Sequence, residues 1–381
     1  MTLSIGITGV AETPLARHPP AGTSTAGLLA QAVRAALDSA GLQLRDVDGL
    51  GLASFTLKPD RAIDFAWRMG LRLRWCLQDE LGGASAINLL RQAWLALQAG
   101  QARTIVLLAG DHFGGADFTA LVRDYNGTAR DLLSPLGCVG PNPLFAMLTQ
   151  RQMAERGLTR ADYGALCVAL RANATAYPQA AFRTPMTLDD YLSAPMVCEP
   201  LSRLDCVPVV SGAAALVLQA RPAGVHVSLR AAVADYNGDQ QEGDGLQTGL
   251  HTCARALWDE AGAGPGDLDV VSVYDDYPAI ALAQLADLGF VADGDLPRFL
   301  QARIATGELA LNTAGGQLSA GQAGTAGGMH GLVEVVRQLL GRAGARQRAG
   351  ARLGLCTGYG MVQYRYGMCA NAAMLERREA A

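Results

Sequence analysis

The sequence predicts an α/β protein whose chain consists of two duplicated β-α-β-α-β halves. A helix-to-strand segment occurs twice, and with 381 residues and 50% hydrophobic content the chain is long enough to bury two such units. Each copy reads as an amphipathic helix that ends at a glycine, followed by a turn and an apolar strand. The residues Arg34, Ala35, Asp38, Ala40, Gly41, Asp46 and Asp48 recur at one constant offset as Arg255, Ala256, Asp259, Ala261, Gly262, Asp267 and Asp269.

The opening stretch MTLSIGITGV is expected to form the first strand. It is apolar but has no basic n-region, no long h-region and no small-residue cleavage site, so it does not resemble a secretory signal. No apolar run reaches the roughly 18 to 20 residues of a membrane-spanning helix. Membrane insertion is therefore not expected. Because the eight cysteines are scattered without a C-x-x-C pair, we expect a cytoplasmic protein without a zinc site of its own.

Two pairs of strands follow matching helices. The strands at 47–54 and 270–274 come after the repeated turn, and their nearly continuous apolar character suits a sheet buried on both faces. A second pair of matching segments comes later in each half. One helix opens at Gly82 and leads into a strand at 104–109, and the other opens at Gly328 and leads into a strand at 352–356.

This pattern divides the chain into an N-terminal half at 1–225 and a C-terminal half at 226–381. Residues from about 112 to 205 have helical patches around 145–156 and 160–176 and are expected to form an inserted cap over the site. Parallel strands place their functional loops at their carboxyl ends. Those loops are the turn before the helix at Gly82, the segment 274–278, the glycine-rich stretch 312–331 and the segment 356–360.

These loops, in this order and at this spacing, resemble the thiolase superfamily, most closely its branch related to the thiolase domain of sterol-carrier-protein enzymes. The resemblance covers essentially the whole chain and implies a five-layer αβαβα sandwich and a homodimer. The cap also resembles the middle region of that branch, at Arg171-Ala172-Asn173-Ala174, Tyr191, Pro195, Pro200-Leu201 and Ser211-Gly212-Ala213-Ala214-Ala215.

The first loop departs from the thiolase pattern. Ordinary thiolases carry a cysteine at this helix N-terminus, where backbone N–H groups and the helix dipole prepare the thiolate for acyl transfer. In this chain the loop reads Gly82-Gly83-Ala84-Ser85, and Gly83 stands at the position of the lost nucleophile. A glycine cannot form an acyl-enzyme, and Ser85, which has no evident base, is expected to cap the helix.

Two further loops also differ from ordinary thiolases. Where many family members have a Gly-His-Pro triplet that helps bind the thioester oxygen, this chain has Gly321-Gln322-Ala323. Gln322 can donate a hydrogen bond but cannot carry a proton between steps. In the last loop, Cys356 resembles the acid/base cysteine of many thiolases, and Tyr359 replaces one glycine of the usual Gly-Gly-Gly run.

A pocket without a nucleophile but with glycine-rich, dipole-lined loops can still stabilise a thioester enolate, which favours carbon–carbon cleavage without covalent catalysis. The runs at 274–278, 312–318 and 321–324 resemble the thiolase-like aldolases of steroid side-chain breakdown. This resemblance implies a lyase that performs retro-aldol cleavage of a β-hydroxyacyl-CoA to a ketone and a short acyl-CoA. It also implies a separate small partner protein that joins an OB-fold to a zinc ribbon.

A retro-aldol reaction needs a base, an oxyanion hole and an acid. No cofactor or metal is expected in this chain, and the substrate is expected to be a CoA thioester. The candidate catalytic residues are Tyr277, His330, Cys356 and Asp276, and the candidate substrate- and oxyanion-binding residues are Asn312, Gln322, Gly358 and Tyr359.

Structural roles remain open for several of these residues. Tyr274 and Tyr277 could be aromatic residues at the sheet rim, and Asp275 and Asp276 could cap a helix beginning near residue 279. The imidazole of His330 could face a neighbouring helix instead of the pocket.

Cys356 could be a small buried hydrophobe, and Tyr359 could pack over the pocket without entering it. Two other functions are also compatible with the sequence: a degenerate thiolase that cleaves a β-ketoacyl-CoA with consumption of CoA, and a non-catalytic scaffold for the partner. A net charge of -4 and a pI near 5.8 argue against nucleic acid as a partner.

Overall fold

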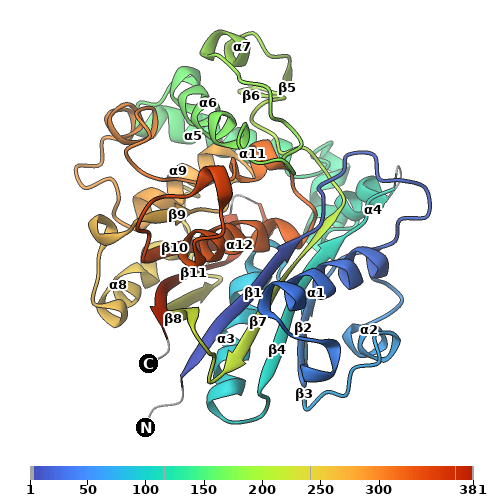
Figure 1. The fold of residues 1–381 in the computed structure, drawn as a ribbon. Helices are drawn as coiled ribbons and strands as arrows, with labels where there is room; N and C mark the ends of the chain where they lie inside the picture. The colour runs from blue at the N-terminus through green and yellow to red at the C-terminus, as the bar shows by residue number, and fades with distance from the viewer. Residues whose placement is uncertain (1–3, 115–116, 241, 365, 380–381) are drawn as a thin grey trace.

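The computed structural model describes residues 4–114, 117–240, 242–364 and 366–379. Its main feature is a mixed nine-stranded sheet in the order β3-β2-β4-β7-β1-β8-β11-β10-β9. β1 and β8 share a single residue pair, Ile7 with Val227. The sheet therefore consists of two halves that meet at this narrow junction (Figure 1).

The N-terminal half contributes five strands. β2 pairs in parallel with β3 and β4, whereas β7 runs antiparallel to both β4 and β1. Every residue of β1, β2 and β4 is buried, as nearly continuous apolar runs predict for strands covered on both faces. The strand bounds are β1 (Ile5–Glu12), β2 (Gly49–Ala53), β3 (Trp75–Asp79), β4 (Thr104–Asp111) and β7 (Gly212–Ala220).

The C-terminal half repeats this arrangement. β9 pairs in parallel with β10, and β11 runs antiparallel to β10 and β8. Leu311 forms an isolated parallel bridge to Val271 at the edge of β9. It takes the place that β3 takes beside β2 in the N-terminal half. The strand bounds are β8 (Val225–Tyr236), β9 (Val270–Ser272), β10 (Leu353–Gln363) and β11 (Tyr366–Glu379).

Helices cover and separate the two halves of the sheet. α3 (Ser85–Gln98) and α12 (Ala326–Leu340) contact each other and strands of both halves, and α12 is buried along nearly its whole length. α1 (Thr25–Ala40) covers β1, β7 and β4, while α8 (Leu250–Ala261) covers β8 and β11. Helices and sheets thus alternate in five layers, which confirms the predicted α/β class and sandwich.

The sequence repeat has a structural cause. Gly41 and Gly262 end α1 and α8 in the left-handed conformation, with φ of 69° and 59°. Asp48 accepts hydrogen bonds from two successive backbone N–H groups at the start of β4, at 2.8 and 2.9 Å. Asp269 does the same at the start of β10, at 2.8 and 2.9 Å. Each aspartate therefore ties its own turn to the neighbouring strand.

The cap is formed between β4 and β7. The helical patches expected around 145–156 and 160–176 correspond to α5 (Asn142–Arg156) and α6 (Arg160–Ala174). Among the described helices, none combines the length and the apolar character that crossing a bilayer requires. The remaining elements are α2 (Ala62–Arg68), α4 (Asp117–Arg123), α7 (Leu188–Leu192), β5 (Met196–Cys198), β6 (Leu201–Ser202), α9 (Pro278–Asp287), α10 (Leu296–Phe299) and α11 (Gly316–Ala320).

Candidate active site

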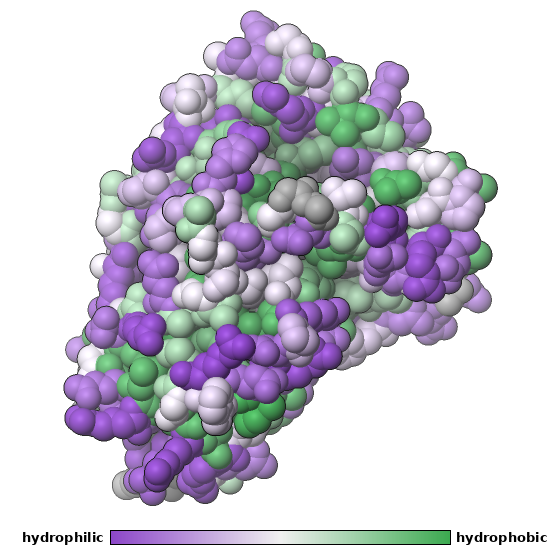
Figure 2. Space-filling view, turned by 90° about the vertical axis from the view of Figure 1, so that its right-hand side faces the viewer, coloured by the Kyte–Doolittle hydropathy of each residue, from purple (hydrophilic) through white to green (hydrophobic). Residues whose placement is uncertain are grey.

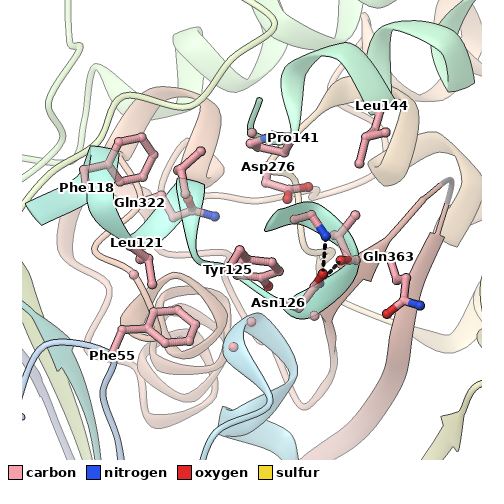
Figure 3. Close-up of a pocket in the computed structure, with 18 of the residues that line it drawn as sticks. Phe55, Phe118, Leu121, Tyr125, Asn126, Pro141, Leu144, Asp276, Gln322 and Gln363 are labelled. Atoms are coloured by element: carbon pink, nitrogen blue, oxygen red, sulfur yellow. Dashed lines mark hydrogen bonds between the residues drawn. The ribbon is translucent and has the colours of Figure 1, made fainter. Parts of the chain in front are cut away.

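A pocket lies between the loops at the carboxyl ends of the strands and the cap (Figure 3). It contains about 970 Å³ of space not filled by protein atoms, mouth included. Four of the residues expected at the site line it: Gly83, Asp276, Gln322 and Tyr359. Tyr274, Tyr125 and a set of apolar cap residues complete the lining.

Gly83 lies in the short 3-10 segment Gly82–Ala84 that leads into α3. A Cβ atom at this position would overlap the ring of Tyr274 and the carbonyl oxygen of Tyr359. The Tyr274 ring therefore occupies the space that a nucleophilic side chain would need. The N-terminal end of this helical segment still faces the pocket, where its partial positive charge favours a developing anion.

Tyr274 follows β9 and is held on several sides. Its backbone N–H donates to the Thr357 hydroxyl at 2.9 Å, and its carbonyl accepts from Gln284 at 2.7 Å. Its phenolic oxygen accepts a hydrogen bond from Nε2 of Gln322 at 2.9 Å. Burial, reinforced by the charge of Asp276, raises the pKa of Tyr274 well above its usual value. The hydroxyl is thus protonated at neutral pH and oriented by its neighbours.

Asp276 presents a carboxyl group to the same pocket. Its Oδ1 atom has no hydrogen-bond partner among the described residues. Burial, together with the negative charge of Asp275, raises the pKa of Asp276 from 3.8 to about 8. A carboxyl group with such a pKa exchanges protons near neutral pH, as a general acid or base must do.

Asp275 points away from the pocket and caps α11. One carboxylate oxygen accepts from the backbone N–H of Gln317 at 2.8 Å, and the other from that of Leu318 at 3.5 Å. Burial raises the pKa of Asp275 to about 7 against these hydrogen bonds and the attraction of His330. The alternative that both aspartates cap the helix near residue 279 is wrong for Asp275.

Two further tyrosines border the pocket. The Tyr359 ring lies 6.5 Å from that of Tyr274 between centroids, and its hydroxyl oxygen accepts the backbone N–H of Gly367. Tyr125 comes from the cap, and burial raises its pKa to about 12. Figure 3 shows Tyr125, Gln322 and Asp276 around one common space. Three phenol groups, those of Tyr125, Tyr274 and Tyr359, thus line the pocket.

The cap side of the pocket is apolar. The outer surface of the molecule on the side of α4, in contrast, is largely hydrophilic, with hydrophobic patches between the hydrophilic areas (Figure 2). Within the pocket, Asn126 is engaged with the protein itself, since it donates to the carbonyl of Val362 at 3.0 Å. The apolar side chains from the cap are Phe113, Phe118, Leu121, Val122, Ala129, Leu133 and Leu144. This wall suits a bulky apolar acyl group.

Several predicted site residues lie outside this pocket. The Tyr277 hydroxyl donates to Oδ1 of Asn142 at 2.5 Å, and its ring stacks on Phe145 with centroids 4.3 Å apart. Asn312 pairs with the backbone of Val273, accepting from its N–H at 2.8 Å and donating to its carbonyl at 3.0 Å. Both side chains therefore hold loops together.

His330, Cys356 and Gly358 do not line the pocket either. Nδ1 of His330 lies 2.8 Å from a carboxylate oxygen of Glu12, and neither residue lines the pocket. Cys356 is fully buried in the hydrophobic core, and burial raises the pKa of its thiol. A Cβ atom at Gly358 would overlap Asn371, so this glycine permits close packing of two strands.

Ser85 does not cap α3, contrary to expectation. It is the first residue of the helix, and its hydroxyl is buried without a hydrogen-bond partner among the described residues. No group of three or more His, Cys, Asp or Glu side chains in the described part of the chain has an arrangement that could hold a metal ion.

Tyr274 lies in a loop that the sequence predicts to be functional, but it is not among the candidate site residues, and a role as an aromatic residue at the sheet rim stays open. Its signal is its place at the end of a buried strand, in the loop that follows the repeated turn. The glycine at position 83 is the complementary signal, because a missing side chain leaves room for a large one from another loop. Only the three-dimensional contact joins these two observations.

Comparison with known proteins relates this chain to several named enzymes. A family model described as thiolase C-terminal domain-like matches residues 231–369. The chain is 33% identical over 365 residues to the 17-hydroxy-3-oxo-4-pregnene-20-carboxyl-CoA lyase of Mycobacterium tuberculosis, covering 88% of this chain and 91% of that protein. It is 31% identical over 364 residues to the steroid side-chain-cleaving aldolase of Thermomonospora curvata, covering 88% and 90%. A solved structure of an Ltp2-ChsH2(DUF35) aldolase matches with a TM-score of 0.81 and 26% identity over 98% of this chain and 97% of that one.

Proposed function

The chain belongs to the thiolase superfamily, in the branch of the steroid side-chain-cleaving aldolases, and on this premise we propose that it is a lyase that cleaves a β-hydroxyacyl-CoA by a retro-aldol reaction. The products are a ketone and a short acyl-CoA. The acyl group is a steroid side chain or a group of similar bulk, for which the apolar cap wall offers a matching surface.

The observation that carries this proposal is the exchange of the nucleophile position for a tyrosine ring. With Tyr274 over Gly83, no acyl group can be attached at this point. The pocket instead contains a carboxyl group with a pKa of about 8 and a phenol hydrogen-bonded to Gln322. These groups suit proton transfer without covalent catalysis.

In the proposed mechanism, ionised Asp276 accepts the proton of the substrate's β-hydroxyl. The bond between Cα and Cβ breaks, its electron pair moves toward the thioester carbonyl, and the ketone forms at Cβ. The helical N-terminus at Gly83 stabilises the enolate oxygen. Tyr274 then protonates Cα, and its phenolate, stabilised by Gln322, recovers a proton from Asp276.

Product analysis tests the reaction. The purified protein is incubated with a β-hydroxyacyl-CoA whose β-carbon is part of a ring, and the ketone and acyl-CoA are measured by mass spectrometry. We expect equal amounts of the two products and no consumption of free CoA. Cleavage of a β-ketoacyl-CoA with uptake of one CoA per turnover would instead support the degenerate thiolase.

We also propose that the chain works as a homodimer together with a small OB-fold and zinc-ribbon protein. The support is the similarity to the Ltp2-ChsH2(DUF35) aldolase, whose description includes a second component. Light scattering should give twice the chain mass of 39.8 kDa for the protein alone. Purification from the native host should add a zinc-containing small protein, and its absence from an active preparation would contradict the proposal.

A further inference from the structure

A second, much smaller cavity lies behind the pocket. It contains about 210 Å³ of unfilled space, against about 970 Å³ for the substrate pocket. Asp275, His330 and Gln317 line it, and Tyr274 lines both cavities. The small cavity is therefore separated from the reacting groups by the loop that carries them. The centre of a water-sized sphere can reach about 10 Å³ of this cavity, which is the lower end of the roughly 10 to 15 Å³ that one water molecule needs.

Two buried polar atoms belong to residues that line this cavity. Nε2 of His330 and Oε1 of Gln317 have no hydrogen-bond partner among the described residues. The two residues are only 4% and 2% exposed. Buried polar atoms of folded proteins are nearly always bonded to protein or to ordered water. A ligand with both donor and acceptor capacity is therefore needed between them.

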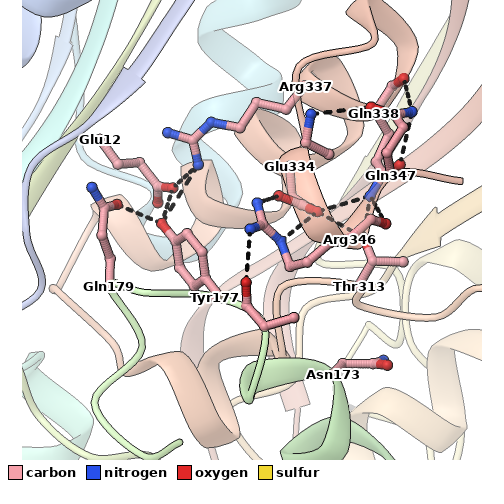
Figure 4. A network of polar contacts seen from close by, with 12 residues as sticks. Glu12, Asn173, Tyr177, Gln179, Thr313, Glu334, Arg337, Gln338, Arg346 and Gln347 are labelled. Carbon is pink, nitrogen blue, oxygen red and sulfur yellow. Dashed lines mark hydrogen bonds and ion pairs between the residues drawn. The ribbon is translucent and has the colours of Figure 1, made fainter.

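The other side of His330 is bound to an ionic cluster. Its Nδ1 lies 2.8 Å from Glu12, which also binds Arg337 and the Tyr177 hydroxyl, each at 2.7 Å. Figure 4 shows Tyr177 and Arg337 around Glu12. Burial opposes charge on His330, but the attraction and hydrogen bond of Glu12 exceed it and raise the pKa of His330. As an imidazolium, His330 has a second N–H to donate.

We propose that the small cavity binds one water molecule, which joins Nε2 of His330 to Gln317 and Asp275, and that His330 is a positioning residue that acts on Asp276 through Asp275. The imidazolium favours the anionic form of Asp275 beneath the catalytic loop. That anion in turn sets the proton affinity of Asp276 in the pocket. The kinetic part of this inference rests on the proposed aldolase reaction.

In the described part of the chain, Asp275 interacts electrostatically with both His330 and Asp276. Asp275 interacts with Tyr274 and Asp276 of its own loop, with His330 of α12 and with Cys167 of α6. His330 interacts with Glu12 of β1, Glu334 of α12 and Asp275. Asp276 interacts with Asp275, Tyr125, Tyr274, Tyr277, Tyr359 and Cys206.

The sign of the effect follows from this chain of charges. Without the imidazolium, the pKa of Asp275 rises further, so that Asp275 stays neutral to higher pH. Because a neutral Asp275 no longer repels the Asp276 anion, Asp276 ionises at lower pH. The acid limb of the kcat profile should therefore move to lower pH by about one unit in His330→Gln. Gln317→Leu, which removes only the acceptor for the water, should move it in the same direction.

The control is His226→Gln, since His226 is also buried but lies on β8 and binds the carbonyl of Gly224 at 3.0 Å. This variant should leave the limb unchanged. If His330→Gln and Gln317→Leu both keep the wild-type limb and only lower the Tm, His330 is a packing residue and the inference fails. Should His330→Gln not fold, Gln317→Leu still decides the question.

Two measurements do not depend on catalysis. A high-resolution crystal structure should contain one ordered water between His330, Gln317 and Asp275, and this water should be missing in Gln317→Leu. NMR of ¹⁵N-labelled imidazoles should find His330 doubly protonated at pH 7. A dry cavity or a neutral His330 would overturn the inference even if the aldolase reaction is confirmed. Conversely, the ordered water and the doubly protonated His330 can be found in a protein without that activity, so the two proposals can fail separately.

Discussion

The Tyr274 ring fills the space next to Gly83 in which a nucleophilic side chain would stand. The two residues come from different halves of the duplicated fold, at the end of β9 and at the start of α3. In the proposed mechanism, Gly83 and Tyr274 take the place of the nucleophilic cysteine of an acyl-transfer site, and Tyr274 transfers a proton instead.

Gly83→Cys should not create a thiolase. The new side chain must displace the Tyr274 ring, and a displacement of about 1 Å at a reacting group typically costs about 100-fold in rate. We expect at least this loss of kcat in the retro-aldol reaction, and no acyl-enzyme by intact-mass spectrometry. Gly266→Ala is the matched control, because a Cβ atom there meets nothing within 4 Å. Trapping a thioester on the introduced thiol with full activity would refute the steric argument.

Tyr274→Phe keeps the ring over Gly83 and removes only the hydroxyl. We expect kcat to fall by about 10² to 10⁴, the usual contribution of a general acid, with little change in KM. Tyr277→Phe removes a hydroxyl that binds Asn142 outside the pocket. It should lower the Tm and retain most of the activity. The opposite ranking of the two variants would return the catalytic role to Tyr277.

Asp276→Asn should remove both activity and its pH dependence. The wild-type kcat is expected to rise with pH and level off above about 8, because the base must be ionised and its pKa is about 8. The variant should lose about 10² to 10⁴ of kcat and show no limb in this range. A pH profile identical in shape to the wild type would exclude Asp276 as the titrating base.

Stability should also depend on pH through the two adjacent aspartates. Their folded pKa values, about 7 for Asp275 and about 8 for Asp276, lie above the reference value of 3.8, so the folded state binds protons more tightly than the unfolded state. Their contribution is complete below about pH 4 and is lost as the pH rises through 7 and 8. Calorimetry should find a lower Tm at pH 9 than at pH 6. This difference should shrink in Asp276→Asn, and an unchanged difference would contradict the raised pKa of Asp276.

Local patterns in the chain were sufficient to predict the architecture. A helix that ends at Gly41 or Gly262 needs a left-handed residue, and glycine adopts that conformation at little cost. Asp48 and Asp269 each bond backbone groups of a neighbouring strand in the same half. Because the helix-ending glycine is a local requirement, and because the glycine and the aspartate both recur at the same spacing, the repeat is visible in the sequence and predicts the duplicated halves.

The set of side chains that line the pocket could not be predicted in the same way. Tyr274 and Tyr277 are three residues apart in an irregular loop, where no periodicity states which side chain faces the substrate. The same is true of Asn312, whose side chain pairs with the backbone of Val273. His330 lies near the start of the glycine-rich helix α12, where a pocket residue would be expected. Its imidazole instead contacts Glu12 of β1, which does not line the pocket.

The amino-acid order alone therefore accounts for the α/β class and the duplication, since both depend on residue type and short-range spacing. The assignment of Gly83 to the nucleophile position comes from the resemblance to the thiolase superfamily. The direction of each side chain in the loops was decided by contacts between segments that are far apart in the chain. Gly83 and Tyr274 illustrate the difference. The sequence shows that position 83 has no side chain, but only the packing of the two halves shows that the Tyr274 ring fills the space beside it.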